Sequence, residues 1–131
     1  MNNNFMKNTM ATDEQKMRRE AQDKLANEVK GLLSHEEQEG LRWKGTSVDL
    51  MEALHVAYET GLLQDEDGIC LSFNNIVRRA CRLLHVVVPR NPYETAARGS
   101  RRKGLQMNSY MTRYVRRNRG NRGGLWVEIG S

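Results

Sequence analysis

The chain has 131 residues, a formal net charge of +5 and two cysteines. This length fits one domain with a modest core and excludes two large domains. No apolar run is long enough to cross a membrane and the N-terminus lacks the apolar stretch of a secretory signal, so we expect a cytoplasmic protein. Because Cys70 and Cys81 form no CxxC pair, we expect two buried free thiols, and no disulfide, metal site or cofactor.

Positive charge is concentrated in the second half of the chain. Residues 1–40 carry six basic and eight acidic residues, whereas residues 69–122 carry thirteen basic residues against Glu94 alone. Twelve of those thirteen are arginine. Such a segment repels itself when folded, which favours a polyanionic partner.

The N-terminal part is predicted to contain one long helix. Residues 1–11, rich in Asn and Met, are expected to form a disordered tail. The helix should cover residues 12–40, with Thr12 as its N-cap. Its apolar stripe from Met17 to Leu33 drifts and keeps no heptad, so we expect it to pack on the rest of the domain or on a partner helix; a coiled coil is the weaker alternative.

Residues 41–131 are predicted to form a helical domain with four further helices. Thr46 or Ser47 can cap a helix that ends at Thr60 and keeps its carboxylates on the face opposite its apolar residues. Those carboxylates are Asp49, Glu52 and Glu59. The next helix follows Ser72, the fourth runs from about Pro92 to Arg102 after an Asn91 cap, and the fifth starts near Asn108 or Ser109.

The end of the chain is less regular. The glycine-rich residues 118–124 are expected to be a flexible basic segment. The final LWVEI can form a short strand or dock Trp126 on the core, and the sequence leaves both alternatives open.

The last three helices each place arginines opposite an apolar stripe. A face that is merely solvated mixes both signs of charge, whereas acidic residues are almost absent here. Since the planar guanidinium suits phosphates and guanine edges, these side chains are candidate nucleic-acid contacts. They are Arg78, Arg79 and Arg82 in the third helix, Arg98, Arg101, Arg102 and Lys103 at the fourth, and Arg113, Arg116 and Arg117 in the fifth. We expect Arg98, Arg101 and Arg102 to face outward as the principal contacts, with Arg78, Arg79 and Arg82 as the alternative set, and the arginines of the fifth helix to hold phosphates.

These patterns predict a mostly α, small helical domain of about five helices with a helix-turn-helix or winged-helix-like arrangement. The function expected is that of a sequence-specific or architectural regulator that binds double-stranded DNA. No catalytic constellation is recognisable and the three histidines are dispersed, so we expect no enzyme. RNA binding through the fifth helix and its RGG-like tail is one alternative. A basic module for an acidic protein, homodimeric through residues 12–40, is another.

Three stretches carry a family resemblance. RWKGTSVDLMEALHVAYETGLL, LSFNNIVRRACRLLHV and YETAARGSRRKGLQMNSYMTRYVRRN resemble the C-terminal domain of the RteC family, regulators of Bacteroides conjugative transposons. The shared pattern covers about residues 41–118 and includes Trp43, Arg102 and Lys103. The resemblance implies a helical, DNA-associated domain that acts in transcription or excision of a mobile element.

Overall fold

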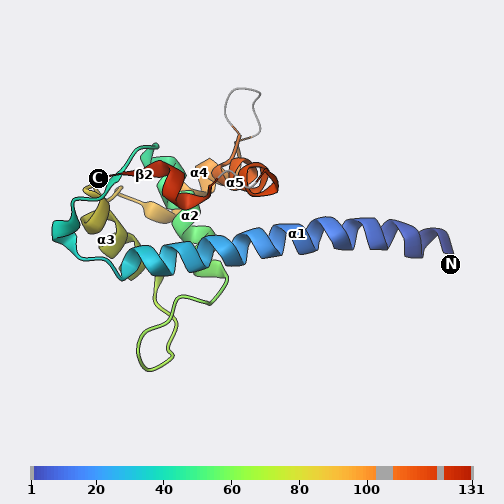
Figure 1. Ribbon diagram of the computed structural model, residues 1–131, viewed down its shortest axis with the longest axis horizontal. Helices are drawn as coiled ribbons and strands as arrows, with labels where there is room; N and C mark the ends of the chain where they lie inside the picture. Colours follow the sequence, from blue (N-terminus) through green and yellow to red (C-terminus); the bar gives the residue numbers. More distant parts are fainter. Residues whose placement is uncertain (1, 103–107, 121–122, 131) are drawn as a thin grey trace.

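The computed structural model describes residues 2–102, 108–120 and 123–130 (Figure 1). Within these ranges the chain forms a mostly helical domain, and the predicted set of five helices with a short C-terminal strand is confirmed. The helices are α1 (Asn2–Leu33), α2 (Ser47–Glu59), α3 (Phe73–Leu84), α4 (Pro92–Ser100) and α5 (Tyr110–Arg119). The 3₁₀ turns η1 (Glu37–Glu39) and η2 (Leu125–Glu128) and the strands β1 (Arg42–Trp43) and β2 (Ile129–Gly130) complete the described fold.

Local side-chain caps explain where four of the helices begin. Thr46, Ser72, Asn91 and Ser109 each accept a hydrogen bond from the backbone N–H three residues later. Each cap satisfies one of the amide groups that a helix N-terminus leaves without a partner. These starts therefore lie where the sequence predicts them, although α4 ends at Ser100, two residues earlier than expected.

Helix α2 is the centre of the domain. It contacts each of the other four helices, and its Leu50, Met51 and Leu54 side chains are fully buried. Its closest neighbour is α4, which approaches at Gly99. A Cβ atom at Gly99 would lie 2.9 Å from Glu52 Oε1 and 3.1 Å from Val48 Cγ1, so a residue without a side chain permits this approach.

Helix α1 differs from the prediction at both ends. It begins at Asn2 and not at Thr12, so the expected tail of residues 1–11 is helical wherever it is described. No Gly or Pro precedes Gly31, and therefore nothing interrupts the hydrogen-bond ladder upstream. The helix ends at Leu33, seven residues before Gly40, and three glutamates follow in residues 36–39. Negative charge beyond a helix C-terminus is unfavourable, which accounts for the early end.

The C-terminal half of α1 packs on the domain. Leu25, Val29 and Leu32 are fully buried, whereas Met17 is 41% exposed. The rest of the helix extends away from the domain (Figure 1). The apolar stripe is thus largely covered by the chain's own helices, as one of the two predicted alternatives requires. In the described ranges neither α1 nor any other helix combines the length and the apolar character of a membrane span.

The end of the chain returns to the start of α2. Strand β2 pairs antiparallel with β1, with Trp43 opposite Ile129. Leu125 is fully buried, while Trp126 is 40% exposed and makes an edge-type ring contact with His35. A short C-terminal strand is therefore present, but of the LWVEI segment it includes Ile129 alone, because Leu125–Glu128 form the turn η2. Leu125 rather than Trp126 supplies the core contact.

The two cysteines differ in exposure, against the expectation that both are buried. Cys81 lies in the core, and this burial raises the pKa of its thiol to about 11. Cys70 is exposed, because it pairs with Gln64 in a bridge within the connection between α2 and α3, which projects from the helices (Figure 1).

The difference in burial predicts a difference in thiol reactivity. Cys70 should react rapidly with a chromogenic disulfide reagent at pH 8, whereas Cys81 should react only at the rate of unfolding, because the thiolate is the reactive form and burial disfavours it. The absorbance change would be followed in native buffer and in denaturant. Cys70→Ser should remove the fast phase and Cys81→Ala the denaturant-dependent one; two fast thiols in native buffer would contradict the packing of α3.

Candidate nucleic-acid interface

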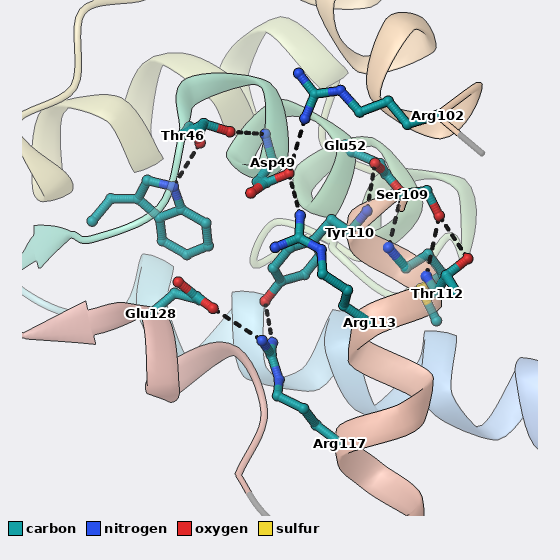
Figure 2. A network of polar contacts seen from close by, with 12 residues as sticks. Thr46, Asp49, Glu52, Arg102, Ser109, Tyr110, Thr112, Arg113, Arg117 and Glu128 are labelled. Atoms are coloured by element: carbon teal, nitrogen blue, oxygen red, sulfur yellow. Dashed lines mark hydrogen bonds and ion pairs between the residues drawn. The ribbon is translucent and has the colours of Figure 1, made fainter. Parts of the chain in front are cut away.

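Two arginines of α5 point into the domain rather than into solvent (Figure 2). Arg113 Nη2 donates to Asp49 Oδ1 at 2.5 Å, and its side chain is one-third exposed. Arg117 donates to Glu128 Oε1 at 2.9 Å and to the Tyr110 hydroxyl at 3.0 Å. The guanidinium groups thus bind α5 to α2 and to the end of the chain.

Tyr110 is neutral within this network. Its ring is buried beneath the Arg113 and Arg117 guanidinium groups, 5.6 and 5.3 Å from the ring centroid. Burial raises the pKa of Tyr110 well above its usual value, and neighbouring Arg117 acts in the opposite direction. The phenol therefore keeps its proton at neutral pH and acts as a hydrogen-bonding group only.

Two carboxylates of α2 receive these contacts, although the sequence placed them on its polar face. Asp49 is 5% exposed and also lies 3.6 Å from Arg102 Nη1. Glu52 is 2% exposed and accepts the backbone N–H groups of Tyr110 and Met111 at 2.8 and 2.9 Å. These two carboxylates are buried although they lie opposite the apolar stripe, because α4 and α5 cover this side of α2; Glu59, at the end of the helix, stays exposed. A carboxylate at the N-terminus of α5 is also favoured by the helix dipole.

The arginines near the end of α4 do not all face outward as predicted. Arg101 is exposed but lies 3.2 Å from Glu94, and Arg102 is turned toward Asp49 with 26% of its side chain exposed. Arg98 is exposed. Lys103 lies outside the described residues. Of the three expected principal contacts, Arg98 alone combines exposure with freedom from a partner among the described residues.

Helix α3 carries a second set of arginines on a separate surface. Arg79 Nε donates to the backbone oxygen of Leu33 at 2.6 Å, and so caps the C-terminus of α1. Arg78 and Arg82 are exposed and have no ion-pair partner in the described part of the chain. The two helices thus differ in how their arginines are paired. Arg78 and Arg82 of α3 have no carboxylate partner in the described ranges, whereas Arg113 and Arg117 of α5 have partners inside the domain.

The predicted site residues therefore do not form one continuous patch. Arg102, Arg113 and Arg117 gather around the carboxylates of the core, and α3 and α5 lie on either side of α2 in Figure 1. Arg116 is exposed on α5.

Two asparagines of α3 were not among the predicted site residues, because that prediction rested on charge. Asn74 and Asn75 are exposed on α3, one turn before Arg78. Their spacing of four and three residues from that arginine places all three side chains on one face of the helix, a signal that was present in the sequence.

Replacing Glu52 by Gln should destabilise the domain by about 2–4 kcal/mol, because two hydrogen bonds to a buried charged acceptor are weakened and an amide N–H group is turned toward backbone donors. The free energy of unfolding would be measured by urea denaturation. Glu66→Gln, at an exposed position of the connection between α2 and α3, removes the same charge and should leave stability unchanged. Equal stability of the two variants would mean that Glu52 does not hold the start of α5.

What these surfaces bind has to be inferred from their own chemistry, since no family model, curated protein or solved structure matches the chain.

Proposed function

We propose that the chain is a DNA-binding regulator that places α3 in the major groove of duplex DNA. One observation carries the proposal: every exposed side chain of α3 is an asparagine or an arginine. These side chains are Asn74, Asn75, Arg78, Arg79 and Arg82, and the other seven residues of the helix are buried.

The composition of this face differs from that of an ordinary solvated surface. Helix α3 contains no Asp, Glu or Lys. Exposed helix faces usually mix acidic and basic residues, because opposite charges three or four positions apart stabilise the helix. A row of arginines without carboxylates lacks the stabilising ion pairs within the helix. Phosphate groups of a nucleic acid would supply the missing negative charge.

The packing of α3 suits insertion into a groove. Ile76, Val77 and Ala80 are buried against the core, and α1 and α2 both contact the helix. The outward face is consequently held on a rigid support, as recognition requires. The major groove of B-DNA is about 12 Å wide and admits an α-helix. In this arrangement α2 is the supporting helix and α3 the helix in the groove, as in a helix-turn-helix, but residues 60–72 form a longer connection than the three- to four-residue turn of that motif.

Duplex DNA is favoured over RNA for two reasons. The major groove of A-form RNA is too deep and narrow for side chains to read. Recognition of single strands uses exposed aromatic rings as stacking platforms. Within the described ranges, the half-exposed rings of Tyr93 and Trp126 belong to α4 and η2, and Tyr93 packs on the ring of Phe73 at the start of α3 rather than standing free as a platform.

The remaining parts of the proposal rest on the expected ligand and on the family resemblance. A protein that binds bacterial DNA acts in the cytoplasm, so we propose that location. The resemblance to the RteC regulators favours a mobile genetic element as the source of the DNA and transcription or excision as the process.

The double substitution Arg78→Ala/Arg82→Ala should weaken binding to duplex DNA and reduce the slope of log K against log salt by about 1 to 2, because each of the two arginines that contacts a phosphate releases about one counterion. The slope would be measured by fluorescence anisotropy across a salt series, with helix content checked by circular dichroism.

Arg18→Ala/Arg19→Ala is the matched control, since it removes two exposed arginines from α1. This control should keep the slope of the unmodified chain. Equal losses in both variants would show that binding follows net charge and does not use α3, and binding to RNA but not to duplex DNA would overturn the proposal.

A further inference from the structure

We infer that α3 reads base sequence, with Asn74, Asn75 and Arg78 as the residues that contact base edges. This inference rests on the proposed function and adds the part of the ligand that is recognised. A protein that held DNA only by its phosphates would need cations alone, whereas the chemistry of this face includes groups suited to bases.

The two asparagines have no electrostatic role. An uncharged amide replaces no counterion on DNA, so a face built only to hold phosphates gains little from Asn74 and Asn75. An amide presents one acceptor and two donors. This pattern pairs bidentately with adenine N6 and N7, as a guanidinium does with guanine O6 and N7.

Capping of the helix does not explain the asparagines either. Asparagine is common near helix N-termini because its side chain can accept a backbone N–H group. In α3 that task belongs to Ser72, whose hydroxyl accepts the Asn75 N–H at 3.1 Å. Both Asn side chains are exposed and have no partner among the described residues. Asparagine is also a weak helix former, so its presence here gives the isolated helix no advantage.

The positions of these side chains match those of base-reading residues. Asn74 and Asn75 lie in the first turn of α3 and Arg78 in the second. In helix-turn-helix proteins the N-terminal part of the groove helix contacts the bases. The ridge from Asn74 to Arg82 is about 12 Å long at 1.5 Å per residue. It therefore spans about three to four base pairs.

The remaining arginines of α3 are assigned by their contacts. Arg79 is held by the Leu33 backbone oxygen and stays out of the groove. Arg82 lies two turns beyond Asn75, and we assign it to a phosphate at the edge of the groove. A division of this kind separates residues that select sequence from those that provide affinity.

The test is a selection from a random duplex library with the full chain, followed by affinity measurements on the enriched sequence. The unmodified protein should enrich a short motif that contains an adenine next to a guanine. Asn74→Ala and Asn75→Ala should each be measured against that motif. At least one of them should lose the preference for adenine at one position by about 5- to 100-fold.

The same variants should bind random duplex with unchanged affinity and salt slope, because no charge is lost. Asn27→Ala is the matched control, since it removes an exposed asparagine from α1 and should retain the motif. Circular dichroism of each variant verifies the fold.

Two results would overturn the inference alone: tight duplex binding without any enriched motif, or a motif that both Asn variants of α3 retain. Absence of duplex binding by the unmodified chain would overturn the proposed function as well. The failure of one claim is in this way distinguishable from the failure of the other.

Discussion

The fold of the second half of the domain depends on two carboxylates buried on α2. Removing a charge from water is costly unless several hydrogen bonds replace its hydration. Glu52 meets that requirement with the first two backbone N–H groups of α5. Asp49 accepts a hydrogen bond from Arg113 and lies in a 3.6 Å ion pair with Arg102. These directional contacts determine where α5 begins and which of its faces lies against α2. Hydrophobic packing alone would constrain that orientation much less.

The same interactions divide the arginines of the chain into two populations. Those near Asp49 and Glu128 neutralise acidic groups within the domain, and their role is structural. Those on α3 lack carboxylate neighbours, and there Arg78 and Arg82 keep their charge available to a ligand. The charge of a sequence segment therefore overstates the positive surface that the folded protein presents. Tertiary pairing, not the number of arginines, decides which residues can meet a polyanion.

Helix α3 combines three roles on different sides of one short element. Its apolar side fills the core, Arg79 on one edge joins the end of α1, and the remaining exposed side chains face solvent. Firm packing restrains the motion of the outward side chains, and a restrained face pays less ordering entropy when it binds. The contact from Arg79 also compensates for the scarcity of basic residues at the end of α1, whose last turn holds Lys30 alone.

The amino-acid sequence determined the starts of α2 to α5 and the face of α3 that enters the core. Both depend on short-range physics: a cap acts over three residues, as at Ser72, and amphipathic spacing repeats within each turn. Only the tertiary structure decided that Asp49 and Glu52 are buried, because their partners are distant in the sequence. Arg113 lies 64 positions from Asp49, and Tyr110 lies 58 positions from Glu52. The local glutamates favour the end of α1 at Leu33, but the group that caps this end comes from tertiary packing, since Arg79 reaches the Leu33 oxygen from 46 residues away. The helical periodicity shows that a polar residue lies off the apolar stripe of its own helix. Whether another helix covers that residue depends on packing between elements, which no local pattern encodes.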